Sequence, residues 1–239
     1  MTGTEKVFER YRTAGTRGTA LAAAWEGYSE YAALRWLPRD KEARILDLGC
    51  GAGEFVEYLR HLGYSNVSGI DYSPEQVAWC RERGLEQVTQ VRDTQAYLRE
   101  RKGAIDCIVM NNVLEHVPKA DIIPLLTLIR ETLPPGGSLI IQVPNMANVF
   151  GLAARYLDFT HEVGFTEHSL RQVLVASGYE EPEVDVAGLP VRLKLTPRRL
   201  LFWSMNRLYT IAHRAAYVAA VGVDAPTIYS KLVMARATR

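Results

Sequence analysis

Hydrophobic positions along the chain follow two different periods, and the changes between them predict the order of the elements. Short runs rich in β-branched and other apolar residues predict strands, whereas apolar residues three and four positions apart predict helices. The predicted strands are Arg44–Leu48, Asn66–Ile70, Gln87–Val91, Ile105–Met110, Ser138–Val143, Glu183–Val186 and Ile228–Ala237. The predicted helices lie near Glu54–His61, Pro74–Glu82, Gln95–Arg101, Ile122–Leu133 and Arg198–Ala220, with another beginning after Thr166.

This alternation of strands and helices predicts βαβ units and a mostly parallel, doubly wound α/β sheet. The pattern of residues 1–42 is polar to mixed and helical, and these residues are predicted to form an N-terminal arm. Residues 43–239 are predicted to form one domain. An insertion at about 188–226, with a helix of its own, separates the last two strands.

Composition and charge argue against several classes of protein. The chain has 28 Lys plus Arg and 27 Asp plus Glu, so no charge excess indicates a nucleic acid partner. Three scattered cysteines are too few for a disulfide framework and favour a cytoplasmic setting: Cys50, Cys80 and Cys107. No uninterrupted run of about 18 apolar residues occurs, and the N-terminus lacks the apolar core of a signal peptide.

A glycine-rich turn follows the first predicted strand, in the run Ile45–Glu54. Such a turn at the carboxyl edge of a parallel sheet binds nucleotide-like ligands. Asp47 and Glu54 flank the turn and would repel a pyrophosphate, whereas both would favour the sulfonium and ammonium of S-adenosylmethionine. The spacing is G-x-G-x-G rather than the dinucleotide G-x-G-x-x-G, which again favours S-adenosylmethionine, with a dinucleotide as the alternative.

Four segments then follow in order: LDLGCGAG, GIDYS, IDCIVMNNVLEHV and LPPGGSLIIQVPN. Together they resemble the successive motifs of class I S-adenosylmethionine-dependent methyltransferases over roughly residues 40–187. The resemblance implies a Rossmann-like, seven-stranded sheet whose last strand is antiparallel. It also implies an enzyme that uses S-adenosylmethionine as its cofactor.

The resemblance assigns cofactor contacts to particular positions. Asp71 would hold the ribose hydroxyls, with Tyr72 beside the adenine. Asp93 would bind the adenine amine, although a helix N-cap is the alternative for this residue, and Asn111 would offer its backbone carbonyl to the ammonium. The complete set of expected cofactor-binding residues is Asp47, Gly49, Gly51, Gly53, Asp71, Tyr72, Asp93, Thr94 and Asn111.

Methyl transfer to a sugar hydroxyl needs a base or a metal near the attacking oxygen. The LEHV segment places His116 after the fourth strand and resembles ubiquinone-type O-methyltransferases, in which a Glu-His pair such as Glu115 and His116 binds a divalent metal. Asn112 replaces the acid expected there, which weakens a metal site. The sequence therefore predicts no metal, with Glu115 and His116 as the alternative.

A second catalytic candidate lies in the loop after the fifth strand, where Asp158 and His161 could act as orienter and base. The stretch from His161 to Tyr179 resembles methyltransferases associated with polysaccharide biosynthesis. The predicted catalytic residues are thus His161, His116 and Asp158.

The insertion is strongly basic. From Val186 onward the acid Asp224 stands against nine basic residues: Arg192, Lys194, Arg198, Arg199, Arg207, Arg214, Lys231, Arg236 and Arg239. Its helix near 198–220 is expected either to pack its apolar side on the domain or to serve as a lid, a dimer contact or a helix on an anionic membrane surface.

The sequence predicts a cytoplasmic O-methyltransferase, with contact to the inner face of the membrane as an alternative. The predicted acceptor is a sugar hydroxyl of a polysaccharide, glycolipid or nucleotide sugar. A phenol or quinone precursor is the alternative acceptor, and a non-catalytic S-adenosylmethionine-binding protein is the alternative of another class. No nucleic acid partner is expected.

Overall fold

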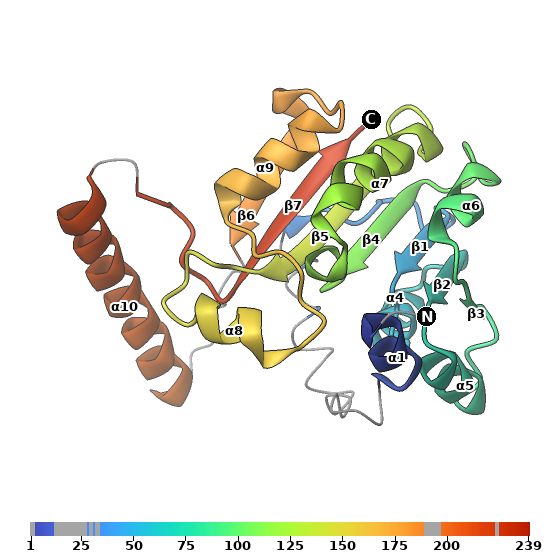
Figure 1. The fold of residues 1–239 in the computed structure, drawn as a ribbon, viewed down its shortest axis with the longest axis horizontal. Coiled ribbons are helices and arrows are strands. Elements are labelled where there is room, and N and C mark those ends of the chain that lie inside the picture. Colours follow the sequence, from blue (N-terminus) through green and yellow to red (C-terminus); the bar gives the residue numbers. More distant parts are fainter. Residues whose placement is uncertain (1–2, 12–27, 29–30, 32–33, 189–196, 223–224) are drawn as a thin grey trace.

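A seven-stranded sheet with helices on both faces forms the centre of the molecule in the computed structural model (Figure 1). The structure describes residues 3–11, 28, 31, 34–188, 197–222 and 225–239. The strand order is β3-β2-β1-β4-β5-β7-β6. The strands are β1 (Ile45–Leu48), β2 (Val67–Asp71), β3 (Val88–Gln90), β4 (Cys107–Asn111), β5 (Ser138–Pro144), β6 (Val184–Gly188) and β7 (Leu232–Thr238).

The sheet is parallel from β3 to β5, and β7 runs antiparallel to both β5 and β6. This arrangement confirms the predicted Rossmann-like class with its antiparallel last strand. The helices are α1 (Gly3–Glu9), α4 (Glu54–His61), α5 (Pro74–Glu82), α6 (Thr94–Arg99), α7 (Lys119–Thr132), α8 (Gly151–Leu157), α9 (Glu167–Ala176) and α10 (Pro197–Val221). The helical arm predicted for residues 1–42 lies largely outside the described residues.

The strands separate two hydrophobic cores because successive side chains of a strand point to opposite faces. In β4, Cys107 and Val109 pack with α4 and α5, whereas Ile108 and Met110 pack with α6, α7 and α9. Both cores are closed to solvent, and the four residues of β1 are buried as well. The sheet therefore provides a rigid base from which the loops at its carboxyl edge extend.

Local signals in the sequence explain where several helices begin. The Ser73 side chain accepts a hydrogen bond from the Gln76 backbone N–H at the start of α5. Thr166 caps α9 in the same way, in a reciprocal pair with Ser169. Each cap satisfies a backbone donor that the helix itself leaves unpaired.

Two expectations about the C-terminal region need correction. The seventh strand begins at Leu232 rather than at Ile228. The residues before Leu232 that were predicted to open this strand do not pair with β5. Two of their carbonyls, those of Ile228 and Ser230, instead accept hydrogen bonds from the Asn145 side-chain amide. The apolar side of α10, for which packing on the domain was one of the expectations, is exposed to solvent, with Leu201 62% and Leu208 67% exposed.

Candidate functional site

A cavity of about 540 Å³ opens at the carboxyl ends of β1, β2 and β4. Its volume suits a small-molecule site, and its position is where an open α/β sheet binds ligands. The structure brings most of the predicted site residues together there. Those that line the cavity are Asp47, Gly49, Gly51, Asp71, Tyr72, Thr94, Asn111 and His116.

The glycine turn fits closely against its neighbours and depends on Asp71. Gly49 has a positive φ of 74°, and a Cβ at this position would lie 2.5 Å from the Val113 side chain. The two carboxylate oxygens of Asp71 accept backbone hydrogen bonds from Gly51 and Ser73, each at 2.8 Å. Asp71 therefore joins the turn after β1 to the turn after β2, besides facing the cavity.

Acidic groups determine the electrostatic character of this part of the cavity. Asp47 is buried, and its Oδ1 makes no hydrogen bond within the described part of the chain. Burial, followed by the nearby charges of Asp71 and Glu54, raises the pKa of Asp47 well above its usual range. A bound cation would relieve this cost, whereas a phosphate would increase it.

Two predicted cofactor residues lie off the cavity wall. Gly53 is the N-cap of α4 with a φ of 79°, and a Cβ there would lie 2.6 Å from Leu85 Cδ1. A glycine is therefore needed here because the turn has a positive φ and packs closely against the Leu85 side chain. Asp93 is exposed and caps α6, because its side chain accepts a 2.9 Å hydrogen bond from the Ala96 backbone. The alternative foreseen for Asp93, a helix N-cap, is what the structure shows.

The N-terminal segment closes one side of the cavity. Phe8, Tyr11 and Tyr28 are among the lining residues. Tyr31 is fully buried and donates a hydrogen bond to the Asn111 side chain at the end of β4. The described residues of the arm thus form part of the cavity wall.

A chain of hydrogen bonds runs from Tyr11 through Asp158 and Thr160 to His116. Asp158 accepts from the Tyr11 hydroxyl at 2.6 Å and from the Thr160 hydroxyl at 2.7 Å. His116 Nδ1 lies 2.8 Å from the same Thr160 oxygen. Burial opposes the ionisation of Asp158, but the hydrogen bonds from Tyr11 and Thr160 outweigh it and lower the pKa of Asp158.

This chain of donors fixes the tautomer of His116. Because the ionised Asp158 can only accept, the Thr160 proton is directed at Asp158, and the Thr160 oxygen accepts from His116. The imidazole then carries its proton on Nδ1 and leaves Nε2 as an acceptor. The pKa of His116 is lowered to about 4 by burial and by the neighbouring His161, so the ring is neutral near pH 7.

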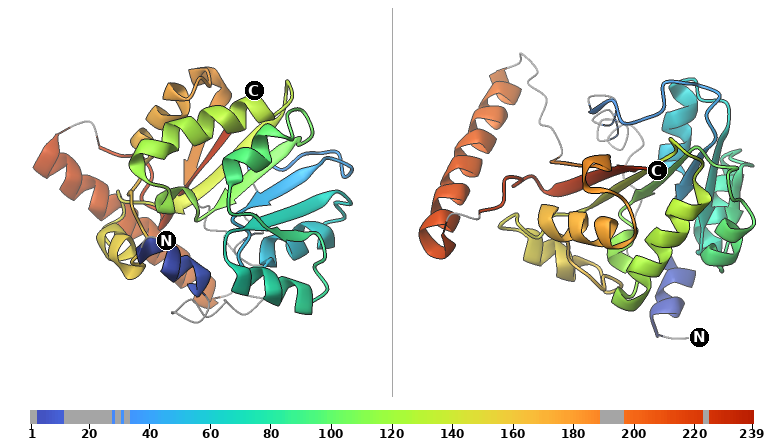
Figure 2. Two further views of the ribbon diagram at one scale, coloured as in Figure 1. Left: turned by 45° about the vertical axis from the view of Figure 1, so that its right-hand side comes forward. Right: turned by 90° about the horizontal axis from the view of Figure 1, so that it is seen from above.

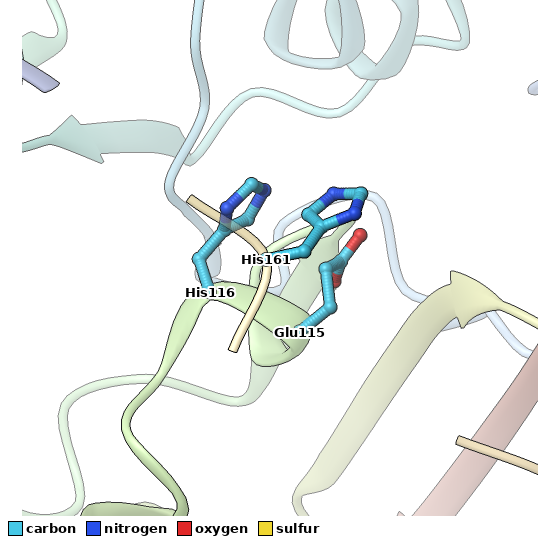
Figure 3. Close-up of side chains that lie close together, drawn as sticks. All are labelled: Glu115, His116 and His161. Atoms are coloured by element: carbon cyan, nitrogen blue, oxygen red, sulfur yellow. The ribbon is translucent and has the colours of Figure 1, made fainter. Parts of the chain in front are cut away.

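Asp158 therefore orients His116 and not His161, contrary to the sequence-based expectation. His161 is absent from the cavity lining, and its Nδ1 lies 3.0 Å from the Ala154 carbonyl. Its ring centroid is 4.7 Å from that of His116 (Figure 3). The loop geometry explains the difference, since the Asp158 side chain bonds to Thr160, two residues on, rather than to the residue after it.

Glu115, His116 and His161 form a compact group, in which one potential ligand atom from each lies within 4.8 Å of the others (Figure 3). Both Glu115 carboxylate oxygens lack a hydrogen-bond partner in the described part of the chain, and burial raises the pKa of Glu115 to about 8. These donors fit a divalent ion such as Zn²⁺, which would polarise an acceptor oxygen. Asn112, at the position of the missing acid, adds no carboxylate.

Sequence reasoning did not connect Tyr11, Thr160 and Phe8 with His116. The Phe8 ring lies edge-on to His116, with 5.8 Å between the centroids. Tyr11 and Asp158 are 147 residues apart in the chain, so no local pattern could pair them. The signal that the sequence offered was the number of aromatic residues in the N-terminal segment, among them Phe8, Tyr11, Tyr28 and Tyr31.

The fold and the acidic, glycine-lined cavity define a class I S-adenosylmethionine-dependent methyltransferase. The family model described as "Methyltransferase domain" matches residues 22–182, and the chain belongs to this family. It is an enzyme that uses S-adenosylmethionine, and the four sequence motifs had indicated the same family.

Two curated relatives have named activities. The chain is 36% identical over 107 residues to a ubiquinone biosynthesis O-methyltransferase of Xanthomonas oryzae pv. oryzae (strain PXO99A), covering 43% of this chain and 44% of that protein. It is 32% identical over 154 residues to a trans-aconitate 2-methyltransferase of Deinococcus radiodurans, covering 61% of this chain and 58% of that protein. The matches thus span about half the length of these relatives.

Solved structures share the fold at low sequence identity. A SAM-dependent methyltransferase from Archaeoglobus fulgidus superposes with a TM-score of 0.63 at 19% identity, covering 89% of this chain and 93% of that one. An S-adenosylmethionine-dependent methyltransferase from Mesorhizobium loti superposes with a TM-score of 0.59 at 22% identity, covering 90% of this chain and 100% of that one.

Proposed function

We propose that the protein is an O-methyltransferase that deprotonates an acceptor hydroxyl with His116. The observation that carries this proposal is the hydrogen-bonded chain from Tyr11 to His116 at the edge of the cofactor cavity. His116 lines the cavity, and its Nε2 makes no hydrogen bond within the described residues. The imidazole is neutral at pH 7 and has one anchored and one open nitrogen, so it can accept a proton. Its lowered pKa makes it a weak base, which the negative charge of Asp158 partly offsets.

The proposed reaction is a single in-line displacement. The acceptor oxygen attacks the methyl carbon of the cofactor, the carbon–sulfur bond breaks, and its electron pair stays on sulfur. The product cofactor is S-adenosylhomocysteine, and the hydroxyl proton passes to His116 Nε2. Alignment of the two reactants supplies much of the rate, and Asp158 stabilises the imidazolium that forms.

A sugar hydroxyl is the acceptor that this arrangement favours. Its high pKa makes a positioned base necessary, whereas a phenol ionises far more readily and depends less on one. The rings of Phe8 and Tyr11, edge-on to His116, would flank a sugar ring. An acceptor on a polysaccharide, glycolipid or nucleotide sugar is consistent with this chemistry.

A phenol or quinone precursor is the second candidate acceptor. The aromatic side chains Phe8, Tyr11 and Tyr72 on the cavity wall favour a flat ring, and the Xanthomonas relative is named for ubiquinone biosynthesis. In this case His116 would be less important, because the acceptor is itself more acidic. The two candidates therefore differ in how strongly the rate depends on His116.

The test is transfer of labelled methyl from S-adenosylmethionine to a panel of nucleotide sugars, glycolipids and phenols. We expect methylated sugar, and we expect His116→Gln to lower kcat by about 10²- to 10³-fold with cofactor affinity unchanged. His168→Gln, at an exposed histidine of α9, is the matched control and should retain full activity. Undiminished turnover in His116→Gln would contradict the proposed base.

A further inference from the structure

Large apolar side chains are exposed on two neighbouring segments of the molecule. Among the described residues, all exposed large hydrophobic side chains except Ile123 and Val175 lie within 149–159 or 200–221. They are Val149, Phe150, Leu152, Tyr156, Leu157, Phe159, Leu200, Leu201, Phe202, Met205, Leu208, Ile211, Val218 and Val221. We call this set the α8–α10 surface.

Helix α10 exposes most of its large apolar side chains to solvent, unlike a helix packed on a domain. Its Trp203, Asn206 and Thr210 are half-buried and line a second cavity against the segment before β7. Leu201 and Leu208, seven residues apart and therefore on one side of the helix, face solvent. A soluble monomer rarely exposes so much contiguous apolar surface without a binding role.

Helix α8 extends this surface toward the active site. The Val149 backbone, just before α8, donates a 3.2 Å hydrogen bond to Tyr209 of α10. Figure 1 and the right-hand view of Figure 2 show α8 between α10 and α1. The chain then passes from α8 directly to Asp158 and Thr160, with Phe159 between them 83% exposed. The apolar surface thus reaches the segment that holds His116.

The charge on helices α8 and α10 themselves has one sign. Helix α10 contains Arg198, Arg199, Arg207 and Arg214 and no acidic residue. Helix α8 contains Arg155 and no acidic residue. Leucine and phenylalanine combined with arginine are typical of helices that lie in the plane of an anionic membrane surface.

We propose that the α8–α10 surface binds the interface of a bilayer that contains anionic lipids. A contact between two copies of the chain is less well matched, because it would bring the arginines of α10 together and neither α8 nor α10 offers an acidic residue to pair with them. None of the helices that the structure describes is long and apolar enough to cross a bilayer. The helices therefore lie on the surface, with their apolar side chains among the outer parts of the acyl chains.

This orientation would place the acceptor side of the catalytic cavity next to the membrane. For the proposed function, on which this step rests, a hydroxyl on a lipid-linked acceptor could then reach His116 without leaving the bilayer. Binding to lipid does not itself depend on methyl transfer. The two proposals can therefore fail separately.

The experiment is flotation of the full-length protein with vesicles, without cofactor or acceptor. Vesicles of phosphatidylcholine alone are compared with vesicles that also contain phosphatidylglycerol. We expect co-flotation with the anionic vesicles, reduced in high salt because surface charges are screened. We expect Leu201→Glu and Leu208→Glu each to lower the lipid-bound to free ratio by about tenfold or more, since each removes one leucine from the apolar contact.

Val175→Glu is the matched control, because Val175 is 41% exposed but lies on α9, outside the α8–α10 surface. It should float like the wild type, and circular dichroism verifies that all variants are folded. Absence of binding to anionic vesicles would overturn the proposal. So would a stable dimer that Leu208→Glu dissociates, because the surface would then join two copies of the chain.

Discussion

The proposed cofactor half and the proposed acceptor half of the cavity are built in different ways. The cofactor half consists of the turns that follow β1 and β2, in which Asp71 binds the backbone of Gly51 and Ser73. The acceptor half joins the N-terminal segment, the turn after β4 and the loop after α8, through Tyr11, Asp158 and His116. The first half is local in sequence, and the second is assembled from distant segments.

This difference separates binding from catalysis. A substitution in the cofactor half should change affinity for S-adenosylmethionine, whereas a substitution in the acceptor half should change the rate of transfer once the cofactor is bound. Substitutions in each half can therefore show whether the two are independent.

Asp71→Ala should have the largest effect on the cofactor half. It removes an expected ribose contact and the acceptor of two backbone hydrogen bonds, each typically contributing about 1.5–3 kcal/mol when the acceptor is charged. We expect at least a 10²-fold loss of cofactor affinity, measured by calorimetry. Thermal unfolding of the cofactor-free variant provides the control for folding. Unchanged affinity would contradict the ribose assignment.

Thr160→Val tests the hydrogen-bonded chain without touching its end groups. Valine preserves the volume but breaks the link between Asp158 and His116, so the imidazole loses its fixed tautomer. We expect kcat to fall by about tenfold, with KM and cofactor affinity nearly unchanged. Thr160→Ser keeps the hydroxyl and should restore most of the rate. If the two variants had equal rates, the hydroxyl would have no positioning role.

Asp47 should make the stability of the cofactor-free protein depend on pH. The pKa of Asp47 is raised in the folded protein, whereas in the unfolded chain it is near 4. The contribution of Asp47 to the free energy of unfolding is therefore complete below about pH 4 and is lost as pH rises through the pKa of the folded protein. Asp47→Asn should abolish this loss and gain about 1 kcal/mol or more at neutral pH. It should also bind S-adenosylmethionine more weakly. Denaturant unfolding at several pH values measures the first effect, and a parallel pH dependence in both proteins would contradict it.

Removal of metal should have the smallest effect. If His116 acts as the base, excess EDTA should leave the rate of methyl transfer unchanged. Loss of activity that Zn²⁺ or Mn²⁺ restores would instead assign the group Glu115, His116 and His161 to an ion. Glu115→Gln, at a fully buried position, would then abolish that restoration.

The contrast between the two halves also explains what the sequence could predict. The bounds of α4 and α5 match the predicted ranges Glu54–His61 and Pro74–Glu82, because caps and glycine turns are local signals. The hydrogen bond between Tyr11 and Asp158 depends on how the N-terminal segment folds over the sheet, and no residue spacing encodes it. Periodicity likewise identified the apolar side of α10 but not whether the domain or the solvent faces it.

The most direct test of the central claim, a single cavity with a cofactor half and an acceptor half, is a crystal structure with S-adenosylhomocysteine bound. We expect the ribose hydroxyls on Asp71 and the cofactor sulfur facing the side of the cavity that His116 lines. A ligand whose sulfur faces away from His116, toward the start of α4, would contradict the claim.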